Sequence, residues 1–317
     1  MTSTAVDTAP IKAKQRPGDR IFSGSAVLAG SLILAVLAAV ASFLIVQSIP
    51  AVTTPAEDIA ILHNAGNFWS YVGPLVFGTL WAAILALIMA VPVAIGVALF
   101  ISHYAPRKLA QGLGYVIDLL AAVPSVVFGL WGGSVLAPAV QPVYQWLVDH
   151  AGWFPLFAGP ASGSGRTILT AAIVLAVMVL PIITAMSREI FLQTPVLHEE
   201  AALALGATRW EVIRMTVLPF GRPGIVAASM LGLGRALGET MAVAMVLSAS
   251  GGVTFALLTS TNPSTIAANI ALSFPEAFGT NINVLIATGL VLFAITLLVN
   301  SIARFIVNRR KAFSGAN

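Results

Sequence analysis

The chain has 317 residues, of which 58% are hydrophobic and only 9% are charged, whereas a soluble domain carries about 25% charged residues. This composition excludes a soluble globular fold, and the absence of cysteine excludes disulfide frameworks, thiolate metal sites and cysteine nucleophiles. The formal net charge of +4 does not indicate nucleic-acid binding, because the basic residues gather at the ends of apolar runs instead of along a groove.

Six apolar segments reach the length of about 20 residues that one crossing of a bilayer requires. Their predicted bounds are residues 24–47, 74–101, 113–136, 167–187, 224–248 and 284–305. The apolar runs are continuous and do not alternate with a period of two, so they predict helices and not the strands of a membrane barrel. We therefore expect an all-α integral membrane protein with six transmembrane helices, its membrane domain at 21–311 and its tails at 1–20 and 312–317.

The first apolar segment has two possible interpretations. A basic tail precedes it, and Ala39-Val40-Ala41 resembles the cleavage site of a secretory signal. The apolar stretch is longer than the hydrophobic region of a signal, which has about 7–15 residues. An uncleaved first span is therefore favoured over a signal peptide.

The connection predicted at residues 140–165 is poor in charge and rich in aromatic residues. It contains Trp146, Trp153, Phe154 and Phe157. Such residues favour the membrane interface, so an anchor in the headgroups and a docking surface for an external partner are both consistent with it. Residues 160–167 look like a degraded phosphate-binding loop, but Pro160 replaces its first glycine and Arg166 its lysine. With no nucleotide-binding motif here, any ATP-driven work is assigned to another chain.

The connection after the fourth segment predicts a helix, a glycine turn and a second helix within residues 195–219. Thr194 and Pro195 fit an N-cap and a first helical position, and Gly206 fits a C-terminal residue with positive φ. Thr208 and Glu211 fit a capping box for a second helix that ends near Pro219. The first helix should place four apolar residues on one face: Leu197, Ala201, Ala202 and Leu205. An ordinary loop and a docking helix explain that face equally well.

The fifth segment holds the two ionisable residues deepest in any predicted span, Arg235 and Glu239. Their spacing of four residues allows an ion pair along one helix face. A structural staple is one interpretation, but charges inside a membrane are costly and usually functional. Because a guanidinium suits a tetrahedral oxyanion, we favour a role for both residues in a substrate pathway. Gly234 and Gly238 have the small-residue spacing that lets a neighbouring helix approach closely.

The connections differ in charge, and this difference predicts the orientation of the chain. All lysines and arginines except Arg166 and Arg235 lie in the N-terminal tail, at the C-terminal end of the membrane domain (residues 304–311) or in the second and fourth connections, which share one side if there are six crossings. Positive charge marks the cytoplasmic side, so both termini should be cytoplasmic. The last connection, residues 255–283, would then be external, and 264–274 in it predict a short interfacial helix.

The segment from Glu200 to Pro219 resembles the EAA signature of bacterial ABC import permeases. The matching residues are Glu200, Ala201, Ala202, Gly206, Leu218 and Pro219. Thr216 stands where the signature usually has an aliphatic residue, a mild departure. In that family the segment is a coupling helix that inserts into a cleft of the ATPase subunit. The resemblance therefore implies ATPase coupling for the six matching residues.

Further segments resemble the PstC-type permease of bacterial phosphate ABC transporters. They are residues 124–132, 234–240, 265–268 and 274–277, and the similarity covers about 20–310. The resemblance implies the type I importer fold, also called MetI-like. Together with Gly234 and Gly238, we expect Pro124 and Gly129 to serve helix packing.

This resemblance implies a permease subunit that forms half of the pathway of an ATP-driven phosphate importer in the bacterial cytoplasmic membrane. Its implied partners are a second permease of the PstA type, two ATPase subunits of the PstB type and an extracytoplasmic phosphate-binding protein of the PstS type. ATP and Mg²⁺ would be used by the ATPase, and this chain would bind no cofactor and catalyse no reaction. A permease for sulfate or molybdate and an ATP-independent secondary transporter remain the alternatives.

Overall fold

The computed structural model describes residues 17–63, 65–250 and 252–311. The expected C-terminal tail at 312–317 and most of the expected N-terminal tail at 1–20 lie outside these residues. The chain divides into two compact units, Met1–Gln47 and Ser48–Asn317. Throughout the described ranges the regular structure is helical apart from one isolated bridge between Ala249 and Asn262, which confirms the predicted all-α fold.

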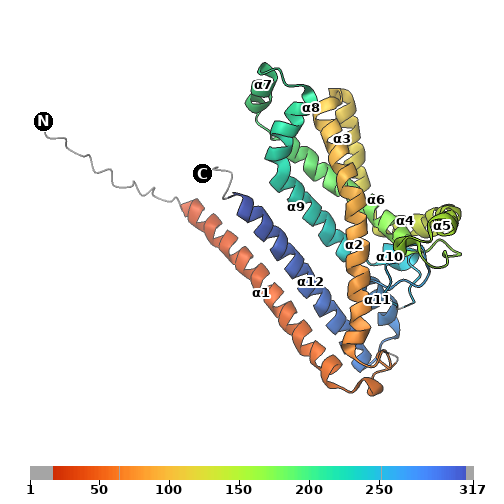
Figure 1. Ribbon diagram of the computed structural model, residues 1–317. Coiled ribbons are helices and arrows are strands. Elements are labelled where there is room, and N and C mark those ends of the chain that lie inside the picture. Colours follow the sequence, from red (N-terminus) through yellow and green to blue (C-terminus); the bar gives the residue numbers. More distant parts are fainter. Residues whose placement is uncertain (1–16, 64, 251, 312–317) are drawn as a thin grey trace. The chain divides into compact units, whose positions relative to one another are not determined.

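The α-helices follow one another along the chain with short 3₁₀ and π-helical segments between them (Figure 1). The α-helices are α1 (Pro17–Thr53), α2 (Phe68–Leu99), α3 (Arg107–Ala121), α4 (Ser125–Trp131), α5 (Ala137–Ala151), α6 (Ile168–Leu192), α7 (Val196–Ala204), α8 (Arg209–Val212), α9 (Leu218–Leu237), α10 (Met241–Val246), α11 (Ile266–Ser273) and α12 (Thr280–Lys311). The 3₁₀ segments are η1 (Ala56–Asp58), η4 (Pro155–Phe157) and η6 (Phe274–Glu276), and the π-helical turns are η2 (Phe100–Tyr104), η3 (Gly132–Leu136) and η5 (Ile213–Val217).

Six helical runs of the described chain are long and apolar enough to cross a membrane, as the sequence predicted. They are Gly18–Thr53, Phe68–Tyr104, Ser125–Ala151, Ile168–Leu192, Arg209–Leu237 and Thr280–Phe305. The third and fifth of these runs differ most from the expected bounds, because the third begins after Pro124 and the fifth ends at Leu237, with Gly238 as the C-cap.

The core of the second unit is built around α6, which packs against α2 on one side and α9 on another. The contact with α2 is close because α2 carries alanine at every fourth position along one face. These alanines are Ala82, Ala86, Ala90, Ala94 and Ala98, each at most 1% exposed. A stripe of small residues lets two helix backbones approach, and the contact is then made by dispersion between closely packed atoms. Larger side chains of α6 such as Val179 and Ile183, both fully buried, complete the core.

Each π-helical turn ends two residues before a proline. The prolines are Pro106, Pro138 and Pro219, and the residue before each donates its N–H to the carbonyl five positions earlier. A proline ring collides with the carbonyl four residues before it, and a wider turn there relieves the collision. At η3 and η5 the helix therefore continues through the proline. The expectation of a helix end near Pro219 is wrong, because α8, η5 and α9 form one run, Arg209–Leu237.

The third span is displaced from the expected residues 113–136. A break directly before Pro124 separates α3 from α4, and the run long enough to span is Ser125–Ala151. Pro124 has no N–H and disfavours helical geometry at the residue before it, so one helix ends and another begins there. The outer connection expected from residue 140 therefore starts only after α5, and Trp146 lies on that helix.

The short helices of the second unit lie at different levels along α2. Figure 1 shows α7 and α8 near the end of α2 that leads into α3, whereas α11 lies nearer to the opposite end. The helix expected within residues 264–274 is confirmed as α11, with Thr265 Oγ1 accepting from the Ala268 N–H at 3.3 Å. Its first turn, Ile266 to Ala268, is buried, and Thr79 Oγ1 of α2 accepts from the Ile266 N–H at 2.9 Å, whereas Leu272 near its end is 61% exposed.

Candidate functional site

The α7 helix ends in the glycine turn that the sequence predicted. Gly206 has φ +84°. Its N–H donates to the Leu203 carbonyl at 2.9 Å, and the Ala207 N–H donates to the Ala202 carbonyl at 3.2 Å. These two bonds form a Schellman motif, which requires a residue in the left-handed region at the position of Gly206. The glycine therefore fixes the direction in which the chain leaves α7.

The start of α7 differs from the expectation. Pro195, not Thr194, is the N-cap residue, and the buried Thr194 Oγ1 makes no hydrogen bond to a described residue. Pro195 is held in extended geometry, so the helix begins one residue later than the sequence suggested and Thr194 lies too early to cap it. Glu199 in the first turn lies 3.5 Å from Nε2 of His103 at the end of η2, which attaches α7 to the second span.

The apolar residues of α7, together with its C-cap residue Leu205, divide between the bundle and the surface. Ala202 is only 7% exposed, whereas Leu197 and Leu205 are 76% and 88% exposed. Glu200 and Ala201 are exposed as well. The single apolar face expected from the sequence is therefore split: Ala202 packs inward and two leucines point away from the chain. Large exposed apolar side chains of this kind mark an interaction surface.

The capping box predicted after Gly206 is present. The Glu211 carboxylate accepts from the Thr208 N–H at 2.7 Å, and Thr208 Oγ1 accepts from the Glu211 N–H at 3.4 Å. These bonds begin the helical run that continues to Leu237. Leu218 and Pro219 lie within this run, so the EAA-like residues occupy two elements joined by the turn at Gly206.

The fifth span is interrupted at the charged residues. Helix α9 ends at Leu237, and α10 begins at Met241. The i,i+4 ion pair expected between Arg235 and Glu239 is not formed, since the ion pairs within 4.0 Å in the described chain are His103 with Glu199 and Arg188 with Glu189. The pairing geometry requires one continuous helix, and the break after Leu237 removes it.

Glu239 and Arg235 instead have separate environments. Glu239 is 8% exposed, and its Oε1 accepts from the Ala242 N–H at 3.1 Å, so its side chain caps the first turn of α10. Arg235 is partly buried, and its Nε–H has no hydrogen-bond partner among the described residues. A guanidinium carries five donors and no acceptor, so an unused buried N–H leaves it able to bind an anion.

The expected packing glycines also differ in their surroundings. A Cβ on Gly234 would meet nothing within 4 Å in the described chain, and one on Gly238 only the Gly234 carbonyl oxygen at 3.6 Å. Close helix approach occurs instead at Gly232, where a Cβ would lie 2.7 Å from Ile183 Cδ1. Gly129 does pack closely, because a Cβ there would lie 2.8 Å from the Cα of Ala242. Pro124, the fourth expected packing residue, is the N-cap residue of α4.

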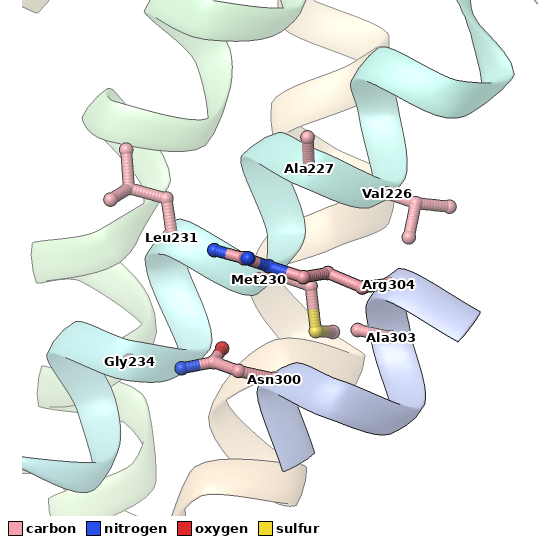
Figure 2. Close-up of a pocket in the computed structure, with 8 residues that line it drawn as sticks. All are labelled: Val226, Ala227, Met230, Leu231, Gly234, Asn300, Ala303 and Arg304. Atoms are coloured by element: carbon pink, nitrogen blue, oxygen red, sulfur yellow. The ribbon is translucent and has the colours of Figure 1, made fainter. Parts of the chain in front are cut away.

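A groove of about 480 Å³ lies between α9 and α12 (Figure 2). It is lined by Val226, Ala227, Met230, Leu231 and Gly234 of α9 and by Asn300, Ala303 and Arg304 of α12. Figure 2 shows Arg304 extending from α12 towards Met230, and Asn300 pointing towards Gly234. The lining is mainly apolar and does not include Arg235 or Glu239. This groove therefore does not contain the expected anion site.

A second hollow, of about 550 Å³, contains Arg166, a residue for which the sequence predicted no role. Arg166 lines it together with the hydroxyl-bearing Ser164 and Ser248 and with Gln141. One signal in the sequence could have identified it, because Arg166 and Arg235 are the two cations outside the N-terminal tail, residues 304–311 and the second and fourth connections.

Comparisons with known proteins agree with this architecture. Residues 90–312 match the family described as binding-protein-dependent transport system inner membrane component. The chain is 45% identical, over 95% of its length and 94% of the relative, to phosphate transport system permease protein PstC 2 of Mycobacterium tuberculosis. It is 43% identical to the PstC protein of Mycobacterium leprae, over 92% of this chain and 94% of that one.

One solved structure has the same fold. A chain of the MetNI methionine ABC transporter, solved in inward-facing conformations, superposes with a TM-score of 0.51 at 19% identity, covering 75% of this chain and 93% of that chain. At this identity the similarity concerns the fold alone. The family match over most of the chain, the PstC relatives and the type I permease fold lead to one conclusion: this multi-pass membrane protein belongs to the inner membrane components of binding-protein-dependent transport systems.

Proposed function

We propose that this chain is the transmembrane permease subunit of an ATP-driven importer of inorganic phosphate and forms half of its translocation pathway. The observation that carries the proposal is the identity of 45% to a phosphate permease over 95% of the chain. The family match over residues 90–312 includes both segments that the mechanism needs, the turn at Gly206 and the break after Leu237.

The coupling residues support an ATP-driven mechanism. The exposed Leu197 of α7 and Leu205, which directly follows α7, would enter a cleft of an ATPase subunit, with Glu200 and Ala201 on the same exposed surface. The helical run from Arg209 to Leu237 connects the end of α7 to the break in the fifth span, a distance of about 39 Å between Arg209 and Arg235 at 1.5 Å per residue. A displacement of α7 by the ATPase would therefore be transmitted along one continuous helical run to Arg235.

Arg235 supports an anionic substrate. A cation held within a membrane span is costly, by about 2.5–3.5 kcal/mol or more, and such residues usually serve transport. Its buried, unbonded Nε–H fits a site that binds a tetrahedral oxyanion transiently through charge-assisted hydrogen bonds. Glu239 caps α10 close to the break, where its carboxylate offsets part of the positive charge and prevents an anion from binding too tightly.

The remaining parts of the transporter would be other chains. The proposal requires two ATPase subunits of the PstB type, which would use ATP and Mg²⁺, because the sequence has no nucleotide-binding motif. A second permease of the PstA type would supply the other half of the pathway. An external phosphate-binding protein of the PstS type would deliver the ion.

The proposed orientation places both termini, α7 and the turn at Gly206 in the cytoplasm, since nearly all basic residues then lie inside. A reporter active only in the cytoplasm should be active when fused after Asn317 or within residues 188–222, and inactive when fused near Gly159. The two activities, normalised to the amount of membrane-inserted protein, measure the topology. An external signal from the 188–222 fusion would contradict the orientation.

The substrate is tested by uptake into vesicles that contain the complete complex and enclosed ATP. Labelled phosphate should enter only with ATP and the ATPase subunits, and excess unlabelled phosphate, but not sulfate or molybdate, should remove the labelled uptake. Uptake that needs no ATPase would favour a secondary transporter. Equal competition by sulfate would favour a permease of broader oxyanion specificity.

A further inference from the structure

The groove between α9 and α12 lies on the side of α9 that is turned away from the core. Gly224 and Gly232 of α9 pack against α6, because a Cβ on either glycine would collide with an isoleucine of that helix. Val226 and Gly234 line the groove and lie two positions further along α9, and two residues of an α-helix turn the side chain by about 200°. This wall of the groove therefore faces away from α6, and Leu231 on it is 53% exposed.

The α9 wall of the groove is apolar throughout and leaves space for a ligand. Its residues are Val226, Ala227, Met230, Leu231 and Gly234. A Cβ on Gly234 would meet no atom of the described chain within 4 Å. The groove volume of about 480 Å³ lies within the range of about 300–1,000 Å³ that is usual for small-ligand sites. This wall can therefore accommodate a flexible hydrocarbon chain.

The α12 wall adds a cation and an amide. Figure 2 shows Arg304 reaching across the groove towards Met230 of α9, and Asn300 lies one helical turn earlier on α12. The last span ends at Phe305, so Arg304 lies at the inner end of this span in the proposed orientation. Arg304 forms no ion pair in the described part of the chain, and no aspartate or glutamate lines the groove. The positive charge in the groove is therefore not compensated.

An anionic phospholipid fits this arrangement better than a helix of a partner chain does. From the surface of a leaflet inward, a phospholipid presents its phosphate, then the ester carbonyls of its glycerol, then its acyl chains. Arg304 and, one turn deeper, Asn300 offer hydrogen-bond donors in that order, beside an apolar wall. Basic pockets between transmembrane helices on the cytoplasmic side bind anionic lipid headgroups. An apolar helix in the groove would instead bury the guanidinium without an acceptor, which is costly.

We propose that the groove between α9 and α12 binds an anionic phospholipid of the cytoplasmic leaflet. Its phosphate lies against Arg304, a glycerol ester against Asn300, and one acyl chain against the α9 wall. The inference rests on the orientation given with the proposed function, which places the Arg304 end of α12 at the cytoplasmic side. The α9 wall belongs to the run Arg209–Leu237, so the bound lipid contacts the helix that carries Arg235.

Photolabelling of the complete complex tests the lipid site directly. The complex is placed in phosphatidylcholine vesicles that contain a small fraction of phosphatidylglycerol with a diazirine on one acyl chain. After illumination, mass spectrometry should find the label on groove-lining residues of α9 or α12, and unlabelled phosphatidylglycerol should displace it. Neither additional phosphatidylcholine nor inorganic phosphate should displace the label, because the former lacks a net charge and the latter lacks an acyl chain.

Variants connect the label to individual residues of the groove, at equal amounts of assembled complex. Arg304→Gln should lower the labelling about fivefold, the factor that corresponds to the attraction of one arginine to an anionic leaflet. Arg304→Lys keeps the charge and should retain most of the labelling. Ala227→Trp fills the groove from an exposed position and should also lower the labelling, whereas Arg107→Gln, at an exposed cation on α3, should not change it.

ATP-dependent phosphate uptake is measured on the same vesicles, so that the lipid site and the proposed function are judged separately. A complex that transports phosphate but carries no label in the groove, or carries equal label in Arg304→Gln, would overturn the lipid site. Displacement of the label by inorganic phosphate would also overturn it, since the groove would then bind a free anion. A labelled groove in a complex unable to transport phosphate would overturn the proposed function and leave the lipid site standing.

Discussion

Replacing Arg235 by glutamine is expected to lower ATP-dependent phosphate uptake about 10- to 150-fold, because a hydrogen bond to a charged group contributes about 1.5–3 kcal/mol and 1.4 kcal/mol corresponds to a factor of ten. Glutamine retains the length and polarity of the side chain, so the variant should still insert. It also leaves the surface of α7 unaltered, so ATP hydrolysis stimulated by the binding protein should persist. Uptake and ATP hydrolysis are compared at equal amounts of complex.

The break in the fifth span provides the controls for this variant. Arg222→Gln removes an exposed cation from the same helix and should leave uptake unchanged. Glu239→Gln retains an oxygen that can accept from the Ala242 N–H, so it should preserve α10 and reduce uptake less than Arg235→Gln. If Arg235→Gln transported phosphate like the unaltered complex, Arg235 would have no place in the pathway.

Replacing Gly206 by valine is expected to abolish coupling, with both stimulated ATP hydrolysis and uptake reduced at least tenfold. At φ +84° a β-branched side chain is strained by about 1–3 kcal/mol. No described atom lies within 4 Å of the added Cβ, so the variant suffers backbone strain and no collision. The strain is relieved by opening the Schellman motif, which changes the direction of the chain between α7 and α8.

Two further variants separate coupling from folding. Gly206→Asn should recover most of the activity, because asparagine tolerates the left-handed region. Gly279→Val introduces comparable strain at φ +57°, also without a neighbour within 4 Å, but in the connection before α12. It should leave stimulated ATP hydrolysis intact. Equal loss in Gly206→Val and Gly279→Val would mean that strain alone, and not the coupling turn, determines the defect.

The spans could be predicted because the bilayer requires long apolar helices wherever the chain crosses it. The ends of the spans were predicted less accurately, because proline ends a helix at some positions of this chain and lies within a continuous helix at others. Pro124 separates two helices, whereas Pro138 and Pro219 lie within continuous runs. The difference lies in the π-helical turns before the latter two, a backbone adjustment that hydropathy does not report.

The candidate site was predicted in part. Gly206 and the capping box at Thr208 follow local rules that involve a few neighbouring residues, and the structure contains both. The predicted ion pair between Arg235 and Glu239 required a continuous helix. The sequence did not indicate the break after Leu237, because this segment is an apolar run in which glycine is common. The place of Arg166 in a hollow could not be predicted, because the hollow forms only where α5, the residues after α10 and the loop before α6 meet in the folded chain.

The most direct test measures ATP hydrolysis and phosphate uptake in the same vesicles for the unaltered complex, Gly206→Val and Arg235→Gln. If a movement of α7 is transmitted along the Arg209–Leu237 run to an anion site, the two variants should have different defects. Gly206→Val should lose both activities, whereas Arg235→Gln should hydrolyse ATP in response to the binding protein without moving phosphate. The opposite result, phosphate uptake by Arg235→Gln in proportion to its ATP hydrolysis, would contradict the account.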